Sequence, residues 1–150
     1  MTRFPASAKI KPTKIVGFYM IKFSTKSQYG LRAMVYLAKN KNKICPLKEI
    51  SNKEGISFDY LEKIISKLEK FGLVKAKKGV QGGYFLAKNP SKIKIGEIIE
   101  SLEGKSNLVK CLQYFCPRSK KCSAKIFWQK LNKAINSALN SVTLADLIKK

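Results

Sequence analysis

The sequence predicts a mostly α-helical protein with one small β-hairpin and a long helix near its C-terminus. Apolar residues recur at intervals of three and four between residues 24 and 71 and again between 126 and 142, as on helices with one buried face. A glycine-rich turn separates two short strand-like segments, which is typical of a β-hairpin. With 150 residues, the chain is long enough for one compact core with extensions.

The chain begins with a segment that has no regular pattern. Residues 1–19 contain four basic side chains, two prolines and no acidic residue. We expect a disordered basic arm, or a start assigned upstream of the functional one at Met20. The first helix should then begin at Ser24 or Ser27, whose hydroxyls suit an N-cap, and end near Asn40.

The next two helices are expected to form a closely spaced pair. Residues 47–54 predict a two-turn helix that stops at Gly55, because glycine readily adopts the left-handed conformation of a helix C-terminus. Ser57 is expected to cap a longer helix whose apolar residues continue to Phe71, with Gly72 closing it. A short helix, a tight turn and a longer helix make a helix-turn-helix.

The hairpin follows this helix pair directly. Residues 73–78 and 84–88 are strand-like, and residues 79–83 between them supply a flexible turn. Lysines on the first strand and glycines at the tip suit a close approach to phosphate groups. This combination predicts a winged helix-turn-helix.

The rest of the chain predicts a second unit. A short helix around residues 95–102 should lead into a cysteine-containing loop, and a long helix should begin at Ser123 as its N-cap and serve in dimerisation. Thr143 to Asp146 fits a capping box for a final turn. We therefore divide the chain into an arm (1–19), a DNA-binding domain (20–90) and a cysteine loop with a dimerisation helix (91–150).

The charge of the chain indicates a polyanionic partner. It has 31 Lys and Arg against nine Asp and Glu, a formal net charge of +22. No acidic residue precedes Glu49, and none lies between Lys70 and Gly96 or between Gly104 and Ala145. A lysine-rich proteome would give a similar excess, but the winged helix-turn-helix favours double-stranded DNA.

Three parts of this unit supply candidate DNA contacts. The second helix of the pair should enter the major groove, the start of the first long helix should hold the backbone, and the wing should contact phosphates. Tyr60 fits the apolar stripe and the DNA face equally well. Glu62 would accept a hydrogen bond from cytosine and so act on specificity. The candidates are Ser24, Lys26, Gln28, Ser57, Asp59, Tyr60, Glu62, Lys63, Lys67, Lys77, Lys78 and Gly82.

The cysteine loop contains the candidate metal ligands. Cys111, Cys116 and Cys122 lie within one short segment of a protein that has no histidine, so a soft metal would be bound through thiolates with a fourth position open. Their spacing is too wide for a zinc knuckle, but a loop of this length can surround an iron–sulfur cluster. A thiol or zinc switch and a loop of idle cysteines remain alternatives, whereas Cys45 is expected to be an ordinary semi-buried thiol.

Other classes of protein fit the sequence poorly. The N-terminal stretch lacks the apolar run of a signal peptide and no later stretch is long enough to span a membrane, so we expect a cytoplasmic protein. No phosphate-binding loop, histidine base or paired carboxylate is present, which argues against an enzyme. A non-specific nucleic-acid-binding protein remains the main alternative outside regulation.

Several segments resemble the IscR/NsrR/RirA family of bacterial winged-helix transcription regulators, and the resemblance runs from Met20 to about Lys149. It implies a homodimer that binds operator DNA and holds an iron–sulfur cluster, of two or four irons, on Cys111, Cys116 and Cys122. It also places Glu62 and Lys78 at positions where family members contact DNA or tune its recognition. The matching segments are residues 21–34, 50–51, 55–57, 60–62, 82–86 and the three-cysteine loop.

The chain departs from this family at two positions. Lys125 stands where one branch supplies a histidine ligand, and Gln28 stands where another supplies an aspartate. Neither replacement provides the familiar fourth ligand. The resemblance therefore implies a cluster that is labile or is completed by another donor.

Overall fold

The computed structural model describes residues 22–105 and 107–149. The expected N-terminal arm lies outside these residues. Six α-helices, one 3-10 helix and a two-stranded antiparallel sheet make up the described chain, which confirms the predicted fold class. In chain order they are α1 (Thr25–Lys39), α2 (Leu47–Glu54), α3 (Phe58–Lys70), β1 (Val74–Lys77), β2 (Gly83–Leu86), η1 (Pro90–Lys92), α4 (Ile95–Glu103), α5 (Lys110–Gln113) and α6 (Ser123–Ser141).

The helix-turn-helix forms where the sequence predicts it. Ser24 caps α1 by accepting a 3.3 Å hydrogen bond from the backbone N–H of Ser27. Gly55 ends α2 with φ 63° and lets the chain turn directly into α3. Ser57 occupies the N-cap position of α3, but its hydroxyl makes no capping hydrogen bond, unlike the prediction.

The wing is a short hairpin tied to the helix pair. Val74 pairs with Leu86 at one end of the ladder and Lys77 with Gly83 at the other. Cys45, in the loop before α2, exchanges backbone hydrogen bonds of 3.0 and 2.8 Å with Tyr84. A Cβ at Gly83 would lie 2.5 Å from the Cys45 carbonyl oxygen, so this close pairing requires glycine.

One core joins the helix-turn-helix to α4. α1 packs against both α3 and α4, and all three helices contribute fully buried side chains. Leu144, near the C-terminus, is buried in the same core. The division at residue 90 stays a prediction, and the buried core extends across it.

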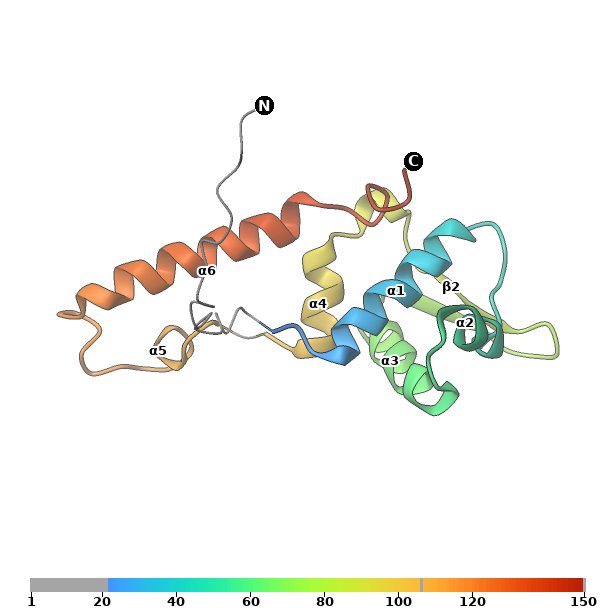
Figure 1. The fold of residues 1–150 in the computed structure, drawn as a ribbon, viewed down its shortest axis with the longest axis horizontal. Coiled ribbons are helices and arrows are strands. Elements are labelled where there is room, and N and C mark those ends of the chain that lie inside the picture. Colours follow the sequence, from blue (N-terminus) through green and yellow to red (C-terminus); the bar gives the residue numbers. More distant parts are fainter. Residues whose placement is uncertain (1–21, 106, 150) are drawn as a thin grey trace, which may run out of the picture.

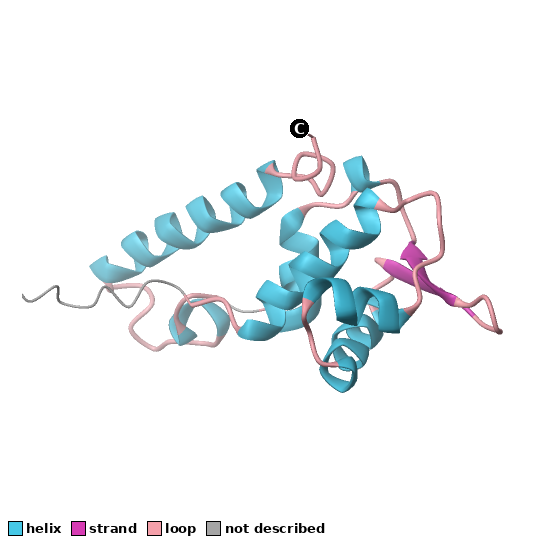
Figure 2. Cartoon of the chain, turned by 45° about the vertical axis from the view of Figure 1, so that its right-hand side comes forward, coloured by secondary structure: helices cyan, strands magenta, loops and turns pink. Residues whose placement is uncertain are grey.

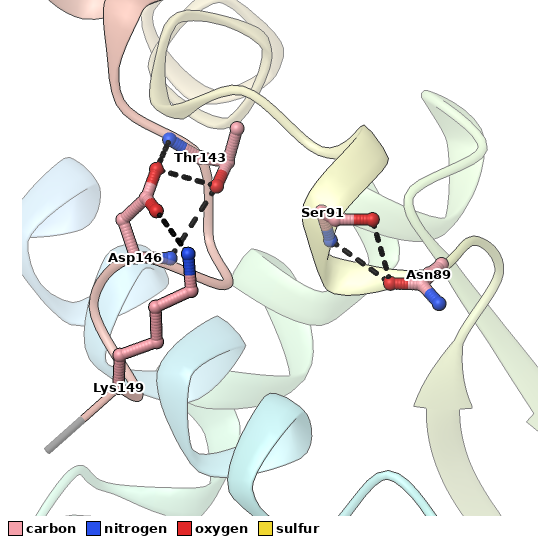
Figure 3. Close-up of polar contacts among 5 residues, drawn as sticks. All are labelled: Asn89, Ser91, Thr143, Asp146 and Lys149. Carbon is pink, nitrogen blue, oxygen red and sulfur yellow. Dashed lines mark hydrogen bonds and ion pairs between the residues drawn. The ribbon is translucent and has the colours of Figure 1, made fainter.

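Two capping arrangements fix the start of η1 and the turn that follows α6 (Figure 3). The Asn89 side chain accepts hydrogen bonds from the backbone and hydroxyl of Ser91, at 3.0 and 2.9 Å, and starts η1. The predicted capping box is present, because Thr143 and Asp146 bond each other's backbone N–H at 2.9 and 3.3 Å. Lys149 adds a 3.0 Å ion pair to Asp146.

The long helix α6 lies apart from the body formed by α1, α2 and α3 (Figure 1). None of its 19 described residues is buried, although it packs partly on α4. The predicted cap is displaced by one residue, because α6 includes Ser123 and Cys122 takes the N-cap position without a side-chain hydrogen bond. The hairpin, magenta in Figure 2, projects from the opposite end of the molecule.

Candidate DNA interface and cysteine segment

The outer face of α3 carries polar side chains that make no core contact. α3 buries Leu61, Ile64, Ile65 and Leu68 on its inner face. The predicted contacts on its outer face are all exposed to solvent and therefore available to a ligand: Ser57, Asp59, Glu62, Lys63 and Lys67.

Tyr60 differs from these neighbours. It is half-buried, packs against the core and meets Tyr29 of α1 edge-to-face, with 6.0 Å between ring centroids. Such a pair stabilises the α1–α3 contact beyond the area that it buries. The structure thus gives Tyr60 a packing role, and its DNA contact stays a prediction.

The wing presents exposed lysines and a turn that needs glycine. Lys77 and Lys78 are exposed next to the tip. A Cβ at Gly82 would lie 2.3 Å from the Lys77 carbonyl oxygen and 2.8 Å from that of Gly79. The Gly82 N–H also donates a 2.9 Å hydrogen bond to Gly79, so this glycine closes the turn, whatever its distance from DNA.

The N-terminus of α1 holds a carboxylate from α4. Glu103 accepts hydrogen bonds from the Ser24 hydroxyl, from the Ser24 N–H at 3.2 Å and from the Ser27 hydroxyl at 2.5 Å. Burial raises the pKa of Glu103, but these hydrogen bonds and the nearby Lys26 outweigh it and lower the pKa overall. The sequence predicts a DNA phosphate at this helix end, whereas the structure places the protein's own carboxylate there.

Gln28 and Lys26 lie beside this carboxylate. The Gln28 side chain donates a 3.1 Å hydrogen bond to the Phe23 carbonyl and is otherwise exposed. Lys26 is half-buried, and its charge contributes to the lowered pKa of Glu103. Both remain close enough to the surface for the predicted backbone contact.

The three predicted metal ligands are free thiols of intermediate exposure. Cys111 lies in the short helix α5, Cys116 in the following loop and Cys122 at the start of α6. Within residues 22–105 and 107–149, no three His, Cys, Asp or Glu side chains converge on a common metal position. The donors fit a thiophilic metal by their chemistry, and binding would require the segment to bring them together.

Lys125, which replaces a potential ligand, is engaged elsewhere. Its ammonium group donates a hydrogen bond to the Ser119 hydroxyl between Cys116 and Cys122. A lysine ammonium has no lone pair, so it orders the loop without ligating a metal.

Cys45 is fully buried, more so than predicted, at the junction of the wing and the helix pair. Burial is the main cause of its raised pKa, and the nearby Glu49 adds to it. It has the environment of an inert packing thiol, in contrast to the three cysteines near α6.

Comparison with known proteins identifies the chain. Residues 23–150 match the model of the Rrf2 family, described as iron-dependent transcriptional regulators. This chain belongs to the Rrf2 family. The HTH-type transcriptional regulator IscR of Klebsiella pneumoniae is 34% identical over 130 residues, 85% of this chain and 80% of that protein.

Solved structures of Rrf2 proteins have the same fold. The IscR of T. potens is 40% identical with a TM-score of 0.71, over 86% of this chain and 87% of the other. CymR of B. subtilis, described as the global cysteine regulator, is 38% identical with a TM-score of 0.71, over 85% and 96%. The oxidised form of Staphylococcus aureus CymR is 32% identical with a TM-score of 0.69, over 87% and 98%.

Membership of the Rrf2 family makes this chain a DNA-binding transcriptional regulator and not an enzyme, as the sequence predicted. Among the described residues, no helix has the length and apolarity needed to cross a bilayer.

Proposed function

We propose that this Rrf2 protein is a cytoplasmic homodimer that binds specific operator DNA through α3 and the wing, and that an iron–sulfur cluster on three cysteines modulates this binding. The observation that carries the DNA-binding part is the exposed polar face of α3, held by buried Leu61, Ile64 and Ile65 and flanked by the basic wing. An α-helix with one such free face fits the major groove.

The case for a homodimer rests on α6. This helix has 19 residues, none of them buried, and Ile126 and Phe127 remain 58% and 57% exposed. An apolar surface of this kind on a regulator is best explained by a second copy of the same helix. A dimer would also present two copies of α3 to the two halves of an operator.

The cysteine segment and the wing lie at opposite ends of the molecule (Figure 1), so any signal between them must pass through the body. α4 provides a connection, since it packs on α1 and α3 and ends only a few residues before α5. Its last residue, Glu103, holds the start of α1 through Ser24 and Ser27. Movement of the cysteine segment would displace Glu103 from Ser24 and Ser27 and so change the position of α1 relative to α4, and with it that of α3.

Cys111, Cys116 and Cys122 would hold the cluster, of two or four irons. When bound, such a group supplies one-electron redox chemistry and sensitivity to oxidants. The chain's own contribution is to offer three thiols on a segment that must reorganise to hold them. With Lys125 in place of a ligand, the remaining coordination position would be open to a small thiol or an oxygen donor.

The direct test is the iron and acid-labile sulfide content, with the visible absorption spectrum, of protein purified without oxygen. We expect stoichiometric iron and sulfide in the wild type, and loss of both when Cys111, Cys116 and Cys122 are replaced by Ala. Cys45→Ala is the matched control, because it removes a thiol that is buried away from this segment. Colourless protein after attempted reconstitution would contradict the cluster proposal.

A cluster-free thiol switch is the second candidate. It is favoured by the cations beside Cys116 and Cys122. This alternative predicts that peroxide treatment of metal-free protein changes operator affinity and that a thiol reductant restores it. Binding that follows iron content alone would exclude it.

Sequence specificity distinguishes both regulators from a non-specific binder. We expect a site selected from random DNA to bind at least about 10³ times more tightly than unrelated DNA at the same salt concentration. A steep salt dependence with no sequence preference would contradict the regulatory proposal.

A further inference from the structure

A large apolar side chain lies exposed on the otherwise polar N-terminal end of α3. Phe58 is the first residue of α3 and is 45% exposed, whereas Leu61 and Ile65, one and two turns later, are completely buried. It is not among the half-buried hydrophobic residues that pack against the core of the described chain. Packing within the fold therefore leaves much of this ring in contact with water.

The position of Phe58 places it where a helix in the major groove meets base edges. In a helix-turn-helix, residues at the N-terminus of the recognition helix contact base edges. Ser57 and Asp59 on either side are exposed, and Glu62 lies one turn further along the same side of α3. Phe58 thus lies on the part of α3 that is proposed to contact the bases.

We infer that Phe58 is a specificity-determining residue that packs against the C5-methyl group of thymine in the operator. The inference rests on the proposed DNA binding through α3. A phenyl ring neither donates nor accepts conventional hydrogen bonds, so it gains little from phosphates or polar base edges. The thymine methyl is the apolar group that the major groove offers, and phenylalanine is one of the side chains that contact it.

The carboxylate of Glu62 adds a second expected base contact, to cytosine. Exposed Glu62 would accept a hydrogen bond from the N4 amino group of cytosine. Four residues separate it from Phe58, a rise of about 6 Å along the helix. Together they predict a half-site in which a thymine and a cytosine lie within about two base pairs of each other.

The surroundings of Phe58 favour DNA over a second protein chain. Its neighbours along α3, Ser57, Asp59 and Glu62, are exposed and polar or charged. Protein interfaces have an apolar centre depleted of charge. In this molecule such a surface occurs on α6 instead, where Ile126 and Phe127 are adjacent and exposed.

The test uses the full-length protein and the operator that it selects from randomised duplex DNA. Each thymine of a half-site is replaced in turn by deoxyuridine, which lacks only the 5-methyl group, and affinity is measured at constant salt. We expect one position at which the replacement weakens binding about fourfold, the effect of one buried methyl group. Phe58→Ala should weaken binding to the thymine operator about four- to tenfold and abolish the difference between thymine and deoxyuridine at that position.

Phe71→Ala is the matched control. Phe71 is 46% exposed, almost as much as Phe58, but it lies at the C-terminal end of α3, about 20 Å along the helix. We expect this variant to keep the wild-type affinity and the full thymine preference. An equal loss in both variants, or a wild-type protein that binds deoxyuridine operators as tightly as thymine operators, would overturn the inference.

These measurements separate this inference from the proposed function. A strongly selected operator that is indifferent to every thymine methyl leaves sequence-specific binding intact and removes the role of Phe58. A protein that selects no sequence at all removes both. The deoxyuridine measurement on wild-type protein stays decisive even if Phe58→Ala fails to fold.

Discussion

Replacing Gly30 by Ala tests how closely α1 and α4 are packed. A Cβ at Gly30 would lie 2.2 Å from Cδ1 of Leu102 and 3.4 Å from Cγ2 of Ile64. Carbon atoms in favourable contact are about 3.5 to 4.0 Å apart, so Leu102 or the helix would have to move by more than about 1 Å. Leu102 is only 2% exposed and has little room to do so.

Two opposing terms decide the size of the effect. Overpacking of this kind costs about 1 to 3 kcal/mol, whereas alanine is favoured over glycine within a helix by about 1 kcal/mol. We therefore expect Gly30→Ala to lower the free energy of unfolding by about 1 kcal/mol. In a Leu102→Ala background the obstructing Cδ1 is absent, so the same change should raise the free energy of unfolding by up to about 1 kcal/mol.

The sign reversal is the result to measure. Urea unfolding of the four proteins at one protein concentration gives the free energy of each, because the midpoint of a dimer depends on concentration. Leu102→Ala alone should cost about 2 to 5 kcal/mol. If Gly30→Ala has the same effect in both backgrounds, the close α1–α4 contact is not what requires glycine.

Three further changes test individual contacts. Glu103→Gln should lower the free energy of unfolding by about 1 kcal/mol at neutral pH. Because the pKa of Glu103 is lowered in the folded protein, the wild type should lose this extra stability as the pH falls through that pKa. Unfolding of the two proteins as a function of acid pH would detect the change. Gly82→Ala places a Cβ against backbone carbonyls of the wing turn. The amide hydrogens of the wing should then exchange faster with solvent, and operator affinity should fall about tenfold. Gln81 is exposed, so the control variant Gln81→Ala should change neither the hydrogen exchange nor the affinity. Tyr36→Phe removes a hydrogen bond to Glu49 and should lower the free energy of unfolding by about 1 kcal/mol. This hydrogen bond, together with burial, raises the pKa of Tyr36 to about 12. The difference in urea stability between the two proteins should therefore have its full size below about pH 10 and disappear as the pH rises through about 12.

Local signals in the sequence were sufficient to predict the helices and the hairpin of the DNA-binding half. Gly55 needs a positive φ that glycine adopts easily, and the periodicity of α3 specifies which side is buried, so the helix pair followed from neighbouring residues. The hairpin followed from its glycines and lysines in the same way. Ser57 shows the limit, because its residue type suits a cap and its hydroxyl nevertheless makes no such bond.

The candidate sites depend on contacts that sequence spacing does not reveal. Cys111, Cys116 and Cys122 are close in sequence, yet the described chain does not bring them to one point, since their segment lacks a buried apolar pattern to fix its path. The exposure of Phe58 was likewise invisible, because it lies at the border between the buried stripe of Leu61 and Ile65 and the exposed side with Glu62, and only packing shows that the core ends before it.

The contact between Glu103 and Ser24 links the DNA-binding helices to the cysteine segment and could not be predicted from the sequence. Seventy-nine residues separate these side chains, and each has an ordinary local role at a helix end. Together they neutralise the N-terminus of α1 with an internal carboxylate, where the sequence alone suggested a DNA phosphate. An operator phosphate at this helix end would meet the negative charge of Glu103, and Glu103 ends the helix that leads to the cysteine segment. DNA and the cysteine segment would then act on the same carboxylate, so Glu103→Gln should weaken the dependence of operator affinity on the state of the cysteines, and an unchanged dependence would place the coupling elsewhere.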